Sequence, residues 1–234
     1  MDVLGRKIFG KTLFYPGCFL KYKAKHLLDN YERILNDLGV SYVKLHGVEQ
    51  CCGMPAFNAG YMDDYKRISD ANMQLFEDQD VSRFVTVCPD CHVMFSQNYP
   101  SLKVEHVTQV IARHLNKVDV KLLPTENEEI TYYDSCSLGR KSGIYHEPRA
   151  ILQRLGYTVR ELRENREKSV CCGAGGGLKQ NSPKIANRMA QILLSKVRTR
   201  KLVTACPSCY LHLKENARDV EVYELSELMV RDEH

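Results

Sequence analysis

The stretch RFVTVCPDCHVMF at residues 83–95 recurs as KLVTACPSCYLHL at residues 201–213. Each copy has a β-rich run that ends at a cysteine, then a Cys-Pro-x-Cys loop, then an apolar run with helical character. The match continues on both sides, in LFYPGCFL (13–20) with TYYDSCSL (131–138) and in VEHVTQVI (104–111) with VEVYELSEL (220–228). The chain is therefore an internal repeat, and its two copies are expected to fold alike.

Ten cysteines follow the same order in both copies: a single cysteine, an adjacent pair before glycine, and the Cys-Pro-x-Cys loop. The first set is Cys18, Cys51, Cys52, Cys88 and Cys91, and the second set is Cys136, Cys171, Cys172, Cys206 and Cys209. The offsets between equivalent cysteines are 118, 120, 120, 118 and 118 residues. This regularity marks the cysteines as the centre of the protein's chemistry.

Strands alternate with helices in each copy. The first copy has expected strands at 12–15, 41–45, 83–88 and 104–108, expected helices at 22–38 and 61–77, and a loop at 51–60. The second copy has expected strands at 130–133, 158–162, 202–205 and 220–223, and expected helices at 147–155 and 183–198. We therefore predict an α/β fold of βαβ units with a small, mainly parallel sheet in each half. The polar stretch 124–129 is the expected linker, which divides the chain into domains 1–123 and 124–234.

Composition restricts the class of protein. The 234 residues are 44% hydrophobic and 26% charged, as in a globular protein. No apolar run is long enough to span a membrane, and the first residues lack the apolar core of a secretory signal, so we expect a cytoplasmic protein. The formal charge of +4 counts all thiols as neutral, and thiolates would cancel it. Nucleic acid is therefore not an expected partner.

The adjacent cysteines argue against disulfides. Neighbouring Cα atoms lie about 3.8 Å apart, whereas a relaxed disulfide needs about 4.4–6.8 Å. In a reducing compartment, regularly spaced cysteines indicate metal or redox chemistry. Because functional groups of open α/β sheets gather at the carboxyl ends of strands, each set is expected to converge there, near the interface of the two halves.

The number of thiols leaves several kinds of site open. A Cys-x-x-Cys loop alone fits a redox dithiol, half a zinc site or half an iron–sulfur site. Structural zinc and a cubane iron–sulfur cluster each take about four ligands, and each set here offers five. Either one cysteine per set is spare, or the cluster is not a simple cubane. The histidines show no metal-binding spacing, and His92 and His212 are expected to be structural.

The cysteine pattern resembles the CCG cysteine-rich domain family, and two tandem copies resemble the B-type subunit of heterodisulfide reductase and its relatives. The stretch DSCSLGRKSGIYHEPRAIL (134–152) is also similar to the family's second domain, although Ser137 stands where histidine is frequent. The resemblance implies two Rossmann-like domains related by a pseudo-two-fold. It also implies that each set of five cysteines binds a non-cubane four-iron cluster, with zinc possible in one site.

The resemblance further implies an iron–sulfur oxidoreductase subunit that acts on sulfur groups. It would reduce a small-molecule thiol disulfide at its clusters, and no catalytic side chain is assigned besides them. The chain lacks a ferredoxin-type cysteine run, so electrons would come from iron–sulfur or flavoprotein subunits of a larger complex. Two alternatives are an electron-relay subunit of a lactate-, glycolate- or sulfur-oxidising complex, and a non-catalytic zinc module.

Overall fold

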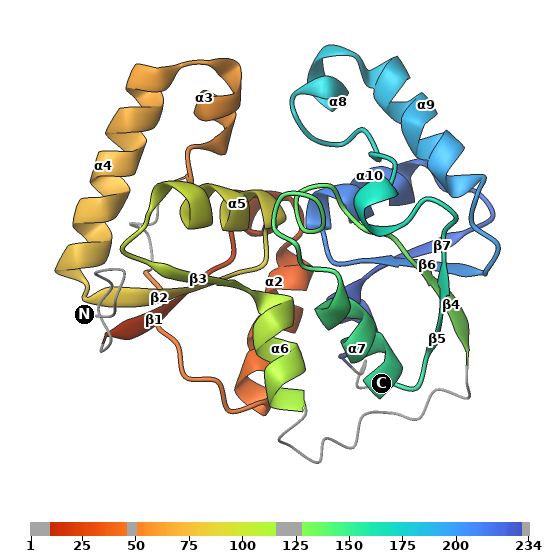
Figure 1. The fold of residues 1–234 in the computed structure, drawn as a ribbon, viewed down its shortest axis with the longest axis horizontal. Helices are drawn as coiled ribbons and strands as arrows, with labels where there is room; N and C mark the ends of the chain where they lie inside the picture. The colour runs from red at the N-terminus through yellow and green to blue at the C-terminus, as the bar shows by residue number, and fades with distance from the viewer. Residues whose placement is uncertain (1–9, 46–50, 116–127, 231–234) are drawn as a thin grey trace.

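The computed structural model describes residues 10–45, 51–115 and 128–230, which form two α/β halves standing side by side (Figure 1). Most of the expected linker at 124–129, and the expected domain boundary after residue 123, lie outside the described residues. Each half has a small sheet, and helices α2, α6 and α7 lie between the two sheets, toward the middle of the molecule (Figure 1). The predicted α/β architecture is confirmed.

The elements follow the repeat of the sequence. In the first half they are β1 (Lys11–Tyr15), α1 (Cys18–Lys23), α2 (Lys25–Asp37), α3 (Met54–Ala59), α4 (Met62–Asp78), β2 (Val81–Thr86), α5 (Pro89–Asn98), β3 (Lys103–His106) and α6 (Val107–Leu115). In the second half they are β4 (Glu129–Tyr132), α7 (His146–Arg154), β5 (Thr158–Glu161), η1 (Arg166–Lys168), α8 (Leu178–Asn181), α9 (Pro183–Leu194), β6 (Lys201–Thr204), α10 (Pro207–Asn216), β7 (Glu221–Glu224) and η2 (Leu225–Leu228).

Both sheets are parallel in all their pairings between named strands. The first has the order β1-β2-β3 and the second the order β5-β4-β6-β7. The second sheet has one strand more than the first, and that strand is β5. The strand expected at 41–45 is wrong, because that segment forms a single bridge, between Val43 and Leu13. Of the segment 41–45, Leu45 alone is buried, and the length of a strand depends on how far the partner strand runs alongside.

Three expected segments needed correction. In the loop expected at 51–60, residues Met54–Ala59 form helix α3. The helix expected at 22–38 is two helices, because Ala24 has a non-helical backbone with φ −145° and ψ 54°. The strand expected at 104–108 ends at His106, and α6 follows at once. The backbone N–H of His106 donates to Gln109 Oε1, and its ring nitrogen Nδ1 accepts from the backbone N–H of Thr108. These side-chain bonds to backbone compete with the strand ladder and start the helix.

One apolar core runs through both halves. Helix α6 packs against α7 across the middle of the molecule. The core cluster includes Phe14, Leu27, Tyr31, Val107 and Ile111 from the first half and Ile130, Tyr132, Ile151, Leu202 and Leu225 from the second. The buried hydroxyl of Tyr31 also donates a 2.6 Å hydrogen bond to Glu224 of the second half. This shared core fixes the halves relative to one another.

A second core, largely aromatic, belongs to the first half alone. The rings of Phe84 and Phe95 are 4.4 Å apart, Tyr15 lies 5.1 Å from Phe95, and Phe76 and Tyr99 complete the cluster. Tilted and edge-on ring contacts of this kind add to the burial of apolar area. They hold α4 and α5 against β2, and so fix the loop that leaves β2 for the Cys-Pro-x-Cys sequence.

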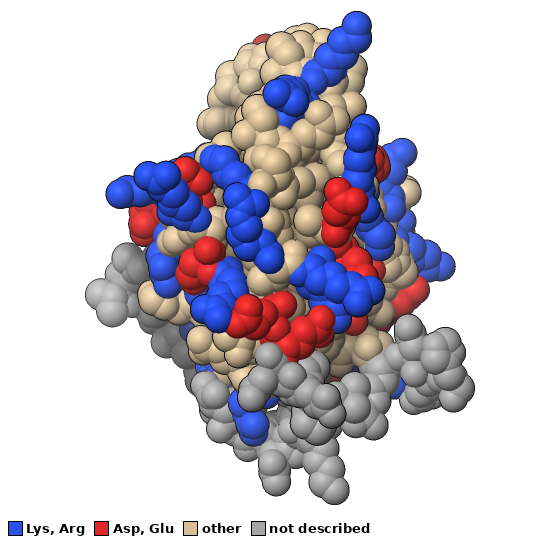
Figure 2. Space-filling view, turned by 90° about the vertical axis from the view of Figure 1, so that its right-hand side faces the viewer, with Lys and Arg blue, Asp and Glu red and all other residues tan. Residues whose placement is uncertain are grey.

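Two helical arms rise above the sheets. Helices α3 and α4 form the first arm and α8 and α9 the second, and α5 and α10 lie between them (Figure 1). On the outer face of the second half, Lys and Arg side chains are interleaved with Asp and Glu (Figure 2). Ion pairs such as Lys201–Glu128 belong to this mixed surface. No helix among the described residues is both long and apolar enough to cross a lipid bilayer.

Candidate metal centres

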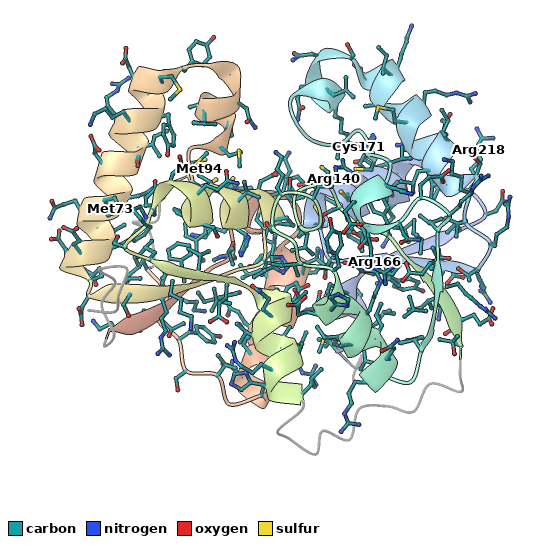
Figure 3. The ribbon with its side chains drawn as sticks, viewed as in Figure 1. Met73, Met94, Arg140, Arg166, Cys171 and Arg218 are labelled. Carbon is teal, nitrogen blue, oxygen red and sulfur yellow. The ribbon has the colours of Figure 1, made fainter. Side chains whose placement is uncertain are left out.

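The cysteines lie at the carboxyl ends of the strands, as the sequence predicts. Cys18 follows β1, Cys88 follows β2, Cys136 follows β4 and Cys206 follows β6. The adjacent pairs stand at the start of the two helical arms. The sulfur atoms of each half therefore gather at one edge of its sheet, beneath its arm (Figure 3).

The five thiols of the first half form a connected series. Neighbouring thiols lie close enough to shift one another's pKa, which connects Cys18 to Cys51, Cys51 to Cys52, Cys52 to Cys91 and Cys91 to Cys88. Burial increases along this series, because Cys18 is exposed and Cys51 half-buried while the other three are buried. The structure therefore brings together all five residues that the sequence placed in the first set.

The second half repeats this order. Cys136 is linked to Cys171, Cys171 to Cys172, Cys172 to Cys209 and Cys209 to Cys206. The sulfur atoms of Cys172 and Cys209 are 3.2 Å apart. The same connection of equivalent residues in two copies indicates one local geometry dictated by the repeated sequence.

The two Cys-Pro-x-Cys sequences form the first turns of α5 and α10. Cys88 and Cys206 are the N-cap residues, and Pro89 and Pro207 occupy the first helical position. Proline suits that position because its fixed φ is helical and no intrahelical partner exists for an N–H there. The N-terminal end of a helix also favours a thiolate over a thiol.

Each Cys-Cys-Gly glycine lies tightly against the long helix of its arm. A Cβ on Gly53 would lie 2.9 Å from the Tyr65 ring, and one on Gly173 would lie 2.9 Å from the backbone oxygen of Ala186. Both glycines have positive φ, 86° and 91°. Their N–H groups point at sulfur, because Gly53 N lies 3.5 Å from Cys51 Sγ. Glycine is required here by both space and backbone conformation.

Neighbouring thiols set the protonation of each site. A hydrogen bond from Cys18 lowers the pKa of Cys51, and one from Cys171 lowers the pKa of Cys172. In contrast, hydrogen bonding to Cys172 and burial raise the pKa of Cys209 well above its usual value. Each adjacent pair thus has one thiol that ionises readily. A metal bound at these sites would require the buried thiols to lose their protons to solvent, since thiolates are the ligands.

The number of thiols in each set bears on the kinds of metal site that it could form. Among the described residues, no group of three or more His, Cys, Asp or Glu side chains already surrounds a single point as ligands of one ion do. A tetrahedral zinc ion needs about four donors at equal distance. Each set offers five thiols, two of them adjacent in the chain, which is one more than a zinc ion or a cubane iron–sulfur cluster takes.

A buried tyrosine lies beneath each set of thiols. Tyr15 and Tyr133 are equivalent in the repeat and 2% and 1% exposed. Burial, followed by the nearby cysteines, raises the pKa of both phenols. The Tyr133 hydroxyl donates to the backbone oxygen of Val170, directly before Cys171. The sequence carried a signal for these residues, since a tyrosine stands three positions before the first cysteine in both copies.

Polar side chains join the two cysteine sets across the interface. Asp90, inside the first Cys-Pro-x-Cys loop, accepts a 2.5 Å hydrogen bond from Ser137, the neighbour of Cys136. His92 Nδ1 lies 2.9 Å from Ser142 Oγ, which itself donates to the backbone oxygen of Ser137. Because the Ser142 hydroxyl proton is engaged in that bond, His92 Nδ1 is the donor in its own hydrogen bond to Ser142 Oγ. Burial lowers the pKa of His92 to about 4, which keeps the ring neutral.

His212 is structural, as expected from the sequence: it is fully buried, and its Nε2 lies 3.1 Å from the backbone oxygen of Ala186. The interface residues Asp90, Ser137 and Ser142 had no signal in the sequence. Single polar residues in loops are ordinary, and only the packing of the halves makes them neighbours.

Curated proteins of several names are similar to this chain. One of the subunits of fumarate reductase (CoM/CoB) from Methanothermobacter marburgensis is 29% identical over 98% of this chain and 48% of its own length. One of the subunits of dihydromethanophenazine:CoB–CoM heterodisulfide reductase from Methanosarcina barkeri is 28% identical, over 93% and 58%. An EtfAB:quinone oxidoreductase of Syntrophomonas wolfei is 29% identical, over 91% and 32%. The chain thus spans about a third to somewhat over half of these relatives.

Among solved structures, an aspartate racemase of Picrophilus torridus matches 94% of this chain and 91% of its own at 11% identity, with a TM-score of 0.42. The family model described as the cysteine-rich CCG domain matches twice, at residues 12–96 and 130–214. Those two matches contain the two connected series of thiols. The chain belongs to the CCG cysteine-rich domain family and carries two copies of its domain.

Proposed function

We propose that this chain is an iron–sulfur oxidoreductase subunit that reduces a small-molecule thiol disulfide, with two non-cubane four-iron clusters held by its two sets of cysteines. The observation that carries the proposal is that both sets are complete and connected in the same order. When bound, such clusters supply single electrons and iron that takes sulfur as a ligand. The relatives named heterodisulfide reductase and fumarate reductase (CoM/CoB) support the redox class.

The burial of the cysteines supports a direction of approach for the substrate. The single cysteine and the first cysteine of each pair are the accessible ones, since Cys18 is exposed while Cys51, Cys136 and Cys171 are half-buried. The remaining thiols are buried. A disulfide would therefore reach each site from the side of these residues. The bond from Ser137 to Asp90 joins the loop of Cys136 to the loop of Cys88 and Cys91 at the interface.

Electrons are proposed to come from a partner. The chain covers between 32% and 58% of the relatives described above, and several of them are named as subunits. An iron–sulfur or flavoprotein subunit of a larger cytoplasmic complex is the proposed donor. The cytoplasm suits a protein whose function requires ten reduced cysteines.

Iron analysis is the first test. The protein is purified without oxygen, and iron, acid-labile sulfide and zinc are measured per chain. The proposal expects iron and sulfide in comparable amounts at both sites. Zinc at two per chain without iron would instead establish the non-catalytic zinc module. The reduced protein is then mixed with a thiol heterodisulfide and an artificial electron donor, and disulfide consumption is the expected result.

Cys52→Ser tests the use of all five thiols at one site. Because Cys52 connects Cys51 to Cys91, its loss should change the visible and EPR spectra of the first site and leave those of the second unchanged. Cys172→Ser is the matched variant for the second site. An unaltered first-site spectrum in Cys52→Ser would show that this thiol is spare.

An electron relay without a substrate of its own is the second candidate. It is favoured by one observation: relatives with similar identity carry the names of different reactions, including EtfAB:quinone oxidoreductase. A shared module that only passes electrons would account for that range. Clusters that reduce and reoxidise normally, together with no disulfide turnover, would establish the relay.

A further inference from the structure

The two halves differ in how the loops that carry their cysteines are anchored. We propose that Arg149 is a positioning residue that ties the loop bearing Cys136 to the loop bearing Cys171 and Cys172. The second site is therefore built before metal arrives. At the equivalent described positions of the first half, Pro16 and Glu32 cannot form this tie. The inference rests on the proposed function only in that the cysteines bind a metal centre.

Arg149 is almost buried, and all five of its N–H groups have acceptors. Its side chain is 7% exposed. Two N–H groups form a fork on Asp134, both at 2.8 Å, and two more reach Glu161 at 2.6 and 2.8 Å. The fifth donates to the backbone oxygen of Tyr145 at 2.7 Å. The ring of Tyr132 lies under the guanidinium, 4.8 Å from ring centre to Cζ. A guanidinium satisfied on every donor defines its neighbours' positions closely.

Asp134 passes this anchoring to both cysteine loops. It lies two residues before Cys136. Its Oδ2 accepts a 2.8 Å bond from the backbone N–H of Arg166, and its backbone oxygen accepts a 2.7 Å bond from Ser169 Oγ, two residues before Cys171. The segment between β5 and the adjacent cysteines is thus held against the end of β4.

Backbone strain at Arg166 accompanies this contact. Arg166 has φ 50°, a conformation that residues other than glycine rarely adopt. Such strain persists only where the surroundings enforce it. Arg140 also donates to the backbone oxygen of Ser169. In Figure 3, Arg140 and Cys171 lie at the inner edge of the second half, with Arg166 between that edge and α7.

The equivalent positions of the first half are identified by a shared helix end. Backbone bonds from Val40 N to Leu35 O and from Tyr157 N to Leu152 O close the same turn in the two halves. When the two halves are aligned on these two bonds, Glu32 stands at the position of Arg149. Lys44, one residue after the Val43 bridge, corresponds to Glu161, one residue after the pairing of Thr131 with Arg160.

The first half therefore has an ion pair of reversed polarity, Lys44 to Glu32 at 2.8 Å. That pair is more open to solvent, with side chains 34% and 25% exposed. The third member is missing, because Pro16 stands at the position of Asp134 in the cysteine-based register. Proline has no side-chain acceptor, so the first pair cannot hold its cysteine loops in this way.

The loops before the adjacent cysteines differ in length as well. Five residues, 46–50, separate Leu45 from Cys51, and eight residues, 163–170, separate Leu162 from Cys171. The longer loop of the second half contains Arg166 and Ser169, the two residues that bind Asp134. The longer loop and the buried arginine are therefore found in the same half, as expected if both serve to anchor its cysteine loops.

The test compares two variants of the full-length, metal-free protein. Arg149→Lys retains the positive charge and loses the planar fork, while Lys44→Met removes the equivalent pair of the first half. The readout is the rate at which iodoacetamide alkylates Cys172 and Cys52, followed by mass spectrometry. These are matched reporters, since the two thiols are equivalent in the repeat and 2% and 4% exposed.

We expect Arg149→Lys to accelerate alkylation of Cys172 at least about tenfold, because charge-assisted hydrogen bonds are lost. The rate at Cys52 should not change, and Lys44→Met should leave both rates unchanged. Equal acceleration at both thiols would mean a general loss of stability, and an unchanged rate at Cys172 would mean no positioning role. Either result overturns the proposal.

Metal retention gives a second readout. Chains that keep only the second site, through Cys88→Ser and Cys91→Ser, are loaded with iron and exposed to a chelator, with Cys206→Ser and Cys209→Ser for the first site. Arg149→Lys should weaken retention about 10- to 100-fold at the second site alone. Equal weakening at both sites, or no weakening at the second, would contradict the proposal.

Two further outcomes, a variant that does not fold and single-site chains that bind no iron, also leave the role of Arg149 decidable. If Arg149→Lys does not fold by circular dichroism, Ser169→Ala removes only the hydroxyl bond to Asp134 and should accelerate Cys172 alkylation about 2- to 10-fold. No acceleration there would overturn the proposal. If neither single-site chain binds iron, the proposed function fails, while the alkylation rates of the metal-free protein still decide the role of Arg149.

Discussion

Replacing Gly17 with alanine is predicted to damage the first cysteine site specifically. Gly17 has φ 86° and ψ 153°, a region that is open essentially to glycine alone. A Cβ there would lie 3.0 Å from Cys88 Cβ and 3.2 Å from Cys91 Sγ. Comfortable separations between such atoms begin at about 3.5 Å. The methyl group must therefore displace either Cys18's own loop or the Cys-Pro-x-Cys loop.

The expected cost has two parts. Holding alanine in this backbone region costs about 1–3 kcal/mol. Overpacking against two buried cysteines adds about 1–3 kcal/mol. A total of about 3 kcal/mol lowers the melting temperature of a chain of this size by roughly 6–12 °C.

The matched control is Gly39→Ala. Gly39 also has positive φ, 65°, but a Cβ there would meet nothing within 4 Å. It should cost only the backbone term of about 1–2 kcal/mol. Thermal unfolding by circular dichroism gives both values, and iron analysis of the loaded proteins should show loss from the first site in Gly17→Ala only. Equal melting temperatures and equal iron in the two variants would refute the steric reasoning.

Three further predictions follow from buried polar groups. Burial raises the pKa of Glu224 from 4.5 to about 7, so the stability that this neutral carboxyl contributes is full below pH 4.5 and is lost, by up to about 3 kcal/mol, as pH rises through 7. In urea unfolding the wild type should therefore lose about this much stability relative to Glu224→Gln between pH 4.5 and pH 8, and a difference between the two proteins that does not change with pH would contradict the assignment. Ser142→Ala removes the acceptor of His92 and should cost about 1–2 kcal/mol in the same assay, whereas no cost would mean that this bridge does not hold the halves. Asn72→Leu removes the 3.0 Å bond to the backbone oxygen of Cys51 and should slow iron uptake at the first site. The melting temperature should change little, because Asn72 Oδ1 has no partner among the described residues. Unchanged uptake would show that this bond does not hold the Cys51 backbone for metal binding.

The sequence predicts much of the fold because the repeat and the local periodicity are carried by neighbouring residues. The pattern around Cys88 and Cys206 gives a strand, a Cys-Pro-x-Cys turn and a helix in both halves. Its errors arise where a distant partner decides. Segment 41–45 is apolar enough for a strand, yet it forms one bridge at Val43 because its neighbour β1 runs alongside it only there.

The ten candidate ligands could be named from spacing alone, since a cysteine set repeated at constant offset is a property of the chain. What joins and anchors the sites could not. Asp90 and Ser137 are 47 residues apart, and Arg149 in a helix reads as an ordinary surface cation. Folding buries Arg149 against Asp134 and Glu161 and removes water as an alternative partner, which turns a common charge into a structural anchor. The sequence determined which thiols belong together in each half, because the order and spacing of the cysteines repeat along the chain. Only the tertiary structure showed how the second half anchors its thiols, because that depends on buried contacts between segments that the repeat does not share.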